Sequence, residues 1–203
     1  MNNGKEEKIK IILLGEPSTG KTSLIKVYLN DKFTEDVPSS LSSSFFQSVI
    51  TVNEKKYLID LWDTVGQENY RSITQHFIRD TNIVIFVYDI TEKHTFNEIE
   101  NYWIDKVKEV LNDSAILGIA GNKEDLYEKE VVEEDKAEKL AKKIGGFFKK
   151  TSAKENPKEF KTFVKMLIEQ FLLKNNKIIK GNNIILNESS IIEDKNKKKK
   201  CCI

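Results

Sequence analysis

Short apolar runs that alternate with longer amphipathic segments constrain the fold most. Runs of strand length occupy residues 9–15, 45–52, 57–62, 82–90, 115–122 and 146–151. Helical spacing of apolar residues marks 21–31, 68–79, 95–112, 133–145 and 157–174. The sequence NEKK at 53–56 indicates a tight hairpin between the second and third runs. Because near-continuous apolar strands between helices are typical of covered parallel sheets, we predict an α/β fold with a mostly parallel six-stranded sheet and helices on both faces.

The length of 203 residues fits one domain with short extensions. We predict an N-terminal extension at 1–8, a single domain at 9–175 and a disordered tail at 176–203 that is rich in Asn, Lys and Ser. The tail has seven lysines against three acidic residues, whereas the whole chain has a net charge of +1. The body is therefore slightly acidic, which argues against a nucleic-acid-binding domain.

Targeting signals and cysteines narrow the class further. The polar start MNNGKEEK lacks the features of a secretory signal, and no apolar run approaches the roughly 18–20 residues of a membrane span. The cysteines are the adjacent pair Cys201 and Cys202, which cannot cross-link a core. We therefore expect a cytosolic protein rather than a secreted disulfide scaffold.

The segment GEPSTGKT at 15–22 joins the first predicted strand to the first predicted helix. It fits the G-x-x-x-x-G-K-[ST] pattern, in which backbone N–H groups and a helix N-terminus hold phosphates. An ordinary glycine-containing turn is the alternative for the segment alone. We expect Lys21 to bring positive charge to the β- and γ-phosphates and Thr22 to offer a hydroxyl to Mg²⁺. The candidate phosphate-binding residues are Gly15, Pro17, Ser18, Thr19, Gly20, Lys21, Thr22 and Ser23.

The segment DTVGQ at 63–67 follows the third predicted strand. Asp63 is suited to contact Mg²⁺ through water, and Gly66 lets its N–H approach a γ-phosphate without a side-chain clash. Gln67 is a candidate catalytic residue that could orient an attacking water. Lys21 is the other candidate catalytic residue. D-x-x-G is a common pattern, but its place some forty residues after a phosphate loop makes it specific.

Two further segments, GNKED at 121–125 and TSAK at 151–154, follow the fifth and sixth predicted strands. Ligands of open α/β sheets bind at such strand ends. Asp125 can accept hydrogen bonds from the ring N–H and the exocyclic amine of guanine, a pattern that adenine does not offer. Solvated polar turns are the alternative for either segment alone. The candidate base-binding residues are Asn122, Lys123, Asp125, Ser152, Ala153 and Lys154.

The four motifs in this order resemble a Ras-superfamily GTPase over about residues 9–174. LWDTVGQENYRSIT at 61–74 and VYDIT at 87–91 are similar to the Rab family. The resemblance implies a monomeric GTP/GDP switch that uses Mg²⁺, hydrolyses GTP slowly and recruits effectors to membranes in vesicle trafficking. It also implies an exchange factor, a GTPase-activating protein and a GDP-dissociation inhibitor or escort protein as partners. The departures Pro17, Ser40 and Val65 leave open a slowly or non-hydrolysing GTP-bound scaffold.

The serine-rich run VPSSLSSSFF at 37–46 is either a plain linker or a switch loop. The family resemblance implies a switch loop, in which Phe33 stacks on guanine and Ser40 binds Mg²⁺. It also implies that Phe45, Trp62 and Phe77 form an aromatic surface for effectors, although a role in the core is the alternative. We expect Trp103 to serve ordinary packing.

The C-terminal KNKKKKCCI has Lys200 at the fourth position from the end, so it does not fit the C-a-a-X pattern. The resemblance implies prenylation of Cys201 and Cys202, and two lipids meet the requirement for stable anchoring. Lys197–Lys200 would add attraction to an anionic leaflet. We therefore expect the cytosolic face of an intracellular membrane, in exchange with the cytosol. A solvated tail or a nuclear signal is the alternative reading of the lysines.

Overall fold

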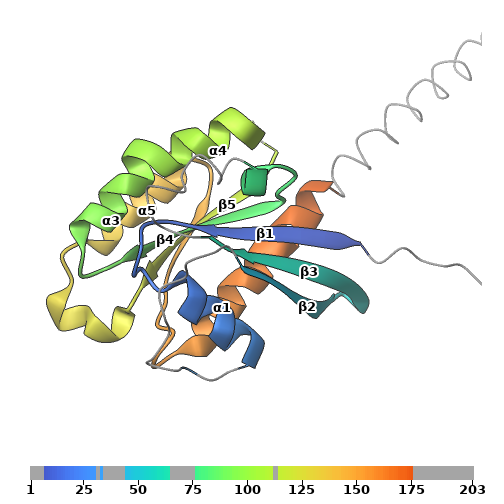
Figure 1. Cartoon of the computed structure of the whole chain (residues 1–203), viewed down its shortest axis with the longest axis horizontal. Helices are drawn as coiled ribbons and strands as arrows, with labels where there is room; N and C mark the ends of the chain where they lie inside the picture. Colours follow the sequence, from blue (N-terminus) through green and yellow to red (C-terminus); the bar gives the residue numbers. More distant parts are fainter. Residues whose placement is uncertain (1–6, 31–32, 34–43, 65–75, 112–113, 176–203) are drawn as a thin grey trace, which may run out of the picture.

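The computed structural model describes residues 7–30, 33, 44–64, 76–111 and 114–175. Within this part of the chain, six strands form one sheet in the order β2-β3-β1-β4-β5-β6 (Figure 1). Strand β2 is antiparallel to β3, and every other neighbouring pair is parallel. The predicted mostly parallel six-stranded sheet is confirmed. The strands are β1 (Lys8–Leu14), β2 (Ser44–Val52), β3 (Lys55–Asp63), β4 (Ile83–Asp89), β5 (Ile116–Asn122) and β6 (Phe147–Lys150).

Four of the five predicted helical segments are found over their length, and two features were not predicted, a π-helical turn and a 3₁₀ helix. The helices are α1 (Lys21–Asn30), α3 (Lys93–Glu98), the π-helical η2 (Ile99–Trp103), α4 (Ile104–Leu111), the 3₁₀-helical η3 (Glu124–Lys129), α5 (Glu134–Lys143) and a helix over 157–175. The helix predicted at 95–112 is thus found at 93–111, with a π-helical turn inside it. Of the helix predicted at 68–79, residues 76–78 are helical and 65–75 lie outside the described residues. No helix in the described ranges has the length and apolar character needed to cross a bilayer.

Alternation along β1 creates two cores, one on each face of the sheet. Ile11 and Leu13 face a cluster that includes residues of α1 and of the helix over 157–175. Ile12 and Leu14 face a second cluster with residues of α3, η2, α4 and α5. These helices cover opposite faces in Figure 1. Fully burying a single Leu or Ile side chain is worth about 1.5–3 kcal/mol, so both faces stabilise the sheet as a rigid platform.

The β2–β3 hairpin follows the predicted turn. Asn53 and Glu54 have φ angles of 49° and 65°, the pair of left-handed residues that a type I′ turn requires. This turn fixes the register in which Phe45 of β2 lies opposite Trp62 of β3. Two of the residues predicted to form an aromatic surface are therefore neighbours.

The carboxyl ends of the five parallel strands lie at one edge of the sheet. Residue 15 follows β1, and β3, β4 and β5 end at Asp63, Asp89 and Asn122. Residue 151 follows β6. Segments far apart in the sequence thus meet at the edge where open α/β sheets bind ligands.

Candidate functional site

The phosphate loop is the turn between β1 and α1, and two glycines let it pass close to neighbouring strands. Gly15 has a φ of +145°, and a Cβ there would lie 2.1 Å from the backbone oxygen of Val87 in β4. Gly20 has a φ of +91°, and its Cβ would lie 2.2 Å from Nδ2 of Asn122 in β5. Neither position accepts a side chain without displacement of the loop. The close packing of the loop therefore explains why glycine stands at positions 15 and 20.

Lys21 begins α1 and turns its ammonium group back into this loop. Its Nζ donates to the carbonyl oxygens of Gly15 at 2.9 Å and Glu16 at 2.8 Å, and the Thr19 hydroxyl donates to the same Glu16 oxygen at 3.0 Å. The side chain is buried. Burial lowers the pKa of Lys21 to about 8, and the negative charges of Asp63 and Glu16 partly oppose this shift. The loop thus encloses a cation where phosphates would bind.

An oxygen pair lies beside this cation. The Thr22 hydroxyl, from the first turn of α1, donates to Asp63 Oδ2 at 2.6 Å. Asp63 ends β3, whose pairing with β1 puts it opposite Leu13. A hydroxyl and a carboxylate are hard oxygen ligands, the kind that Mg²⁺ shares with substrate phosphates. The donor set therefore fits a magnesium ion.

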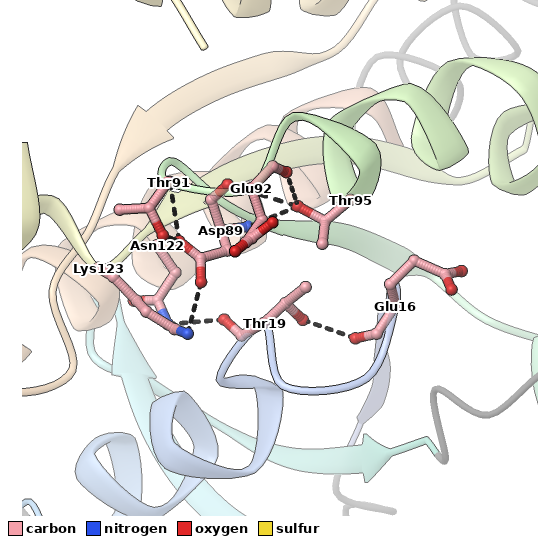
Figure 2. A network of polar contacts seen from close by, with 8 residues as sticks. All are labelled: Glu16, Thr19, Asp89, Thr91, Glu92, Thr95, Asn122 and Lys123. Atoms are coloured by element: carbon pink, nitrogen blue, oxygen red, sulfur yellow. Dashed lines mark hydrogen bonds and ion pairs between the residues drawn. The ribbon is translucent and has the colours of Figure 1, made fainter. Parts of the chain in front are cut away.

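Asn122 joins this loop to the predicted base-binding segment. Its Nδ2 donates to the Thr19 carbonyl oxygen at 2.9 Å, and the Thr151 hydroxyl donates to its Oδ1 at 3.4 Å. The next residue, Lys123, has a left-handed φ of 68° and an ion pair to Asp89 Oδ2 at 2.5 Å. Figure 2 shows the Asn122 amide directed to Thr19 of the phosphate loop and the Lys123 ammonium paired with Asp89.

Asp125 lies beside the segment that follows β6. The Ser152 hydroxyl donates to Asp125 Oδ1 at 2.6 Å, and the Glu124 N–H donates to the Thr151 carbonyl oxygen at 3.1 Å. Ala153 is buried and Lys154 is exposed. The two predicted base-binding segments are therefore in direct contact.

The remaining predicted residues vary in position. Pro17 and Ser18 are exposed, and Ser23 is half-buried. Phe33 is partly buried and packs against the core on the α1 face. Some predicted site residues lie outside the described residues, and their roles stay predictions. They are Ser40, Gly66, Gln67, Lys197–Lys200, Cys201 and Cys202.

Phe45, Trp62 and Phe77 form one aromatic cluster. The ring centroids of Phe45 and Trp62 are 5.0 Å apart, and those of Trp62 and Phe77 are 5.5 Å apart. Phe45 is 46% exposed, whereas Trp62 and Phe77 are partly buried against the core of the α3 face. The Lys10 ammonium lies 5.3 Å from the centroid of Trp62. The cluster thus has one exposed ring supported by two half-buried ones.

Sequence reasoning missed two parts of the site. Asp89 was not singled out, although its Oδ1 accepts hydrogen bonds from the N–H and hydroxyl of Thr91 while its Oδ2 binds Lys123. Trp103 does pack in the core, as predicted, but packing alone is not its whole role. Its indole N–H donates to Oε1 of Glu16 in the phosphate loop at 3.1 Å. No spacing pattern signals a contact between residues so far apart in the sequence.

Gly15 and Gly145, two of the glycines with positive φ, allow a matched test of the loop geometry. Gly145 has a φ of +67° and nothing within 4 Å of a Cβ built there. We expect Gly145→Ala to lower the free energy of unfolding by about 1–2 kcal/mol, the backbone cost alone. Gly15→Ala should lower it by more than twice as much, because its Cβ also meets the Val87 carbonyl. Urea denaturation measures both, and equal losses would contradict the close approach.

Comparison with known proteins agrees with this geometry. The model of the Ras family matches residues 10–172. Ras-related protein SEC4 of Saccharomyces cerevisiae is 36% identical over an alignment of 210 positions, which covers 98% of this chain and 94% of the yeast protein. Ras-related protein Rab-21 of Homo sapiens is 35% identical over 153 residues, or 75% of this chain and 68% of the human protein.

Neither the relatives nor the geometry favours the alternative of a non-hydrolysing scaffold. The phosphate loop, the Thr22–Asp63 pair and the contact between the two base-binding segments lie where the Ras family model matches. The chain belongs to the Rab family of Ras-superfamily small GTPases, and it is a GTP-hydrolysing molecular switch of vesicle trafficking.

Proposed function

We propose that the phosphate loop holds the phosphates of GTP and GDP with a magnesium ion beside them. The observation that carries the assignment is the Thr22–Asp63 hydrogen bond at 2.6 Å, next to a lysine whose ammonium lies within the loop. Lys21 binds the β- and γ-phosphates, and the backbone from Gly15 to Ser23 surrounds them. Thr22 and Ser40 supply hydroxyl ligands, and Asp63 acts through water. When bound, Mg²⁺ neutralises charge on the phosphate oxygens.

The two segments that meet through Asp125 and Ser152 select guanine over other bases. The Asp125 carboxylate accepts hydrogen bonds from the ring N–H and the amine of guanine, and the Ser152 hydroxyl orients that carboxylate. The Ala153 N–H donates to the guanine carbonyl, with Lys154 beside it. Asn122 and Lys123 brace the segment through Thr19 and Asp89, which their contacts support. Phe33 completes the pocket by stacking on the base.

Hydrolysis in this proposal is the attack of water on the γ-phosphate. Gln67 orients the water, and the Gly66 N–H binds the γ-phosphate. Catalysis is mainly positioning and electrostatic stabilisation, and Lys21 supplies a fixed positive charge. The intrinsic rate is slow, and an activating protein accelerates it.

As a Rab-family protein, the chain acts with effectors, exchange factors, activating proteins and a GDP-dissociation inhibitor. We place effector contact at Phe45, Trp62 and Phe77, because aromatic side chains are favoured anchors at protein interfaces. The exposed ring of Phe45 supports this assignment. The protein acts as a monomer in this proposal.

Rab-family proteins associate with membranes on the cytosolic side. Here Cys201 and Cys202 carry prenyl groups, and Lys197–Lys200 add attraction to anionic lipid. The protein then cycles between the cytosolic face of an intracellular membrane and the cytosol.

Base choice can be tested at Asp125. We expect Asp125→Asn to weaken GTP binding about tenfold to a hundredfold, because the amide keeps one of the two acceptor oxygens and a lost hydrogen bond to a charged group is worth about 1.5–3 kcal/mol. The same change should favour xanthosine nucleotides, whose C2 carbonyl faces the donor end of the new amide. Competition against a fluorescent GDP measures both effects, with Glu124→Gln as a neighbouring charge-neutralising control. Equal binding of ATP and GTP by the unaltered protein would refute the guanine assignment.

Membrane attachment can be tested at the paired cysteines. Cys201→Ser with Cys202→Ser should leave nucleotide binding intact and move the protein to the soluble fraction. The four lysines add only about 1 kcal/mol each near an anionic leaflet, and salt screens that attraction. Fractionation of cells in high salt measures the outcome, with Ser189→Ala and Ser190→Ala as a tail control that keeps the cysteines. Undiminished membrane association of the cysteine variant would rule out lipid anchoring at these residues.

A further inference from the structure

A buried carboxylate lies in the phosphate loop itself. Glu16 follows Gly15 and is only 7% exposed. Its Oε1 accepts a hydrogen bond from the indole N–H of Trp103 at 3.1 Å, and Trp103 is 1% exposed. Burying a carboxylate is costly unless it is hydrogen-bonded. The Trp103 indole is therefore a hydrogen-bond partner that this buried carboxylate needs, within the loop that would bind anions.

The backbone of Glu16 belongs to the cation site as well. Its carbonyl oxygen accepts hydrogen bonds from Lys21 Nζ at 2.8 Å and from the Thr19 hydroxyl at 3.0 Å. Figure 2 shows the Glu16 carboxylate directed away from Thr19, on the far side of the backbone from that carbonyl. A carboxylate that rotated toward the ammonium would attract it strongly, because the interaction of two charges grows as their separation and the local dielectric fall. The same carboxylate would repel phosphates.

The donor is held by an unusual piece of helix. Trp103 is the last residue of η2, and the Ile104 N–H donates to the Ile99 carbonyl oxygen, five residues back. Such π-helical turns are rare and occur often at functional sites. The Tyr102 ring packs edge-on to Trp103 with centroids 5.0 Å apart. The wider turn and the core around it set the direction of the indole N–H.

We propose that Trp103 is a positioning residue for nucleotide binding. By donating a hydrogen bond to Glu16, the indole holds the carboxylate away from Lys21. The Lys21 ammonium can then bind the phosphates. The inference rests on the proposed role of Lys21 and adds a residue outside all four nucleotide-binding motifs.

The test is the rate of nucleotide release from the full chain. Trp103→Phe keeps a ring in the core but removes the donor. We expect release of a fluorescent GDP in Mg²⁺ to become about tenfold faster, which corresponds to about 1.4 kcal/mol. Adding Glu16→Gln to this variant removes the competing charge. The double variant should release GDP within about threefold of the wild-type rate, which is well below the tenfold increase expected for Trp103→Phe alone. A void left by the indole would not be repaired in this way.

Two further variants complete the design. Tyr102→Phe, next to the donor, should change release less than twofold, a fold-change that is a small fraction of the tenfold step. Glu16→Asp keeps the charge but shortens the side chain by one methylene, so it should speed release even if Trp103→Phe does not fold. If the rate of GDP release is unchanged in both Trp103→Phe and Glu16→Asp, the inference is wrong. It is also wrong if the double variant releases GDP as fast as Trp103→Phe. In both cases the proposed function still stands. No binding of the fluorescent GDP by the wild type would overturn the proposed function and the inference together.

Discussion

The Asn122 side chain connects the two halves of the site. Its amide binds the carbonyl of Thr19 in the phosphate loop and the hydroxyl of Thr151 after β6. It is 1% exposed, so these hydrogen bonds form away from water, where an unpaired amide would be costly. The close approach of Gly20 to Nδ2 is part of the same contact. A nucleotide that spans both halves thus meets a prearranged surface, because one buried amide fixes the distance between them.

Among the described residues at this edge of the sheet, charge is organised around one buried ammonium, that of Lys21. Lys21 lies near Asp63 and Glu16, and each carboxylate has a neutral donor, the Thr22 hydroxyl for one and the Trp103 indole for the other. A buried cation without anions would be destabilised by desolvation, and burial lowers the pKa of Lys21 for that reason. The arrangement keeps positive charge available while restraining the acids that surround it. In the proposed function, nucleotide affinity depends on where these acids point.

Local sequence signals predicted the strands and the hairpin of the sheet well. The strand boundaries agree within about two residues because apolar runs ended at turn residues, and NEKK formed the expected hairpin. The contacts made by Asp89 and Trp103 were not predictable in this way. Each is formed by residues brought together by sheet order or helix packing, and the π-helical turn that ends at Trp103 interrupts the regular spacing on which helix prediction depends. Roles assigned to Ser40, Gly66 and Gln67 stay predictions, since these residues lie outside the described ranges.

Single-turnover phosphate release from bound GTP decides whether this geometry makes a GTP-hydrolysing switch. We expect slow release on the scale of about 10⁻⁴ s⁻¹ without a partner, dependent on Mg²⁺ and accelerated by an activating protein by about 10³–10⁵. ATP should give no release, and Gln67→Leu should slow the intrinsic reaction. Tight GTP binding with no phosphate release, even in the presence of an activating protein, would show that the chain is not a GTP-hydrolysing switch.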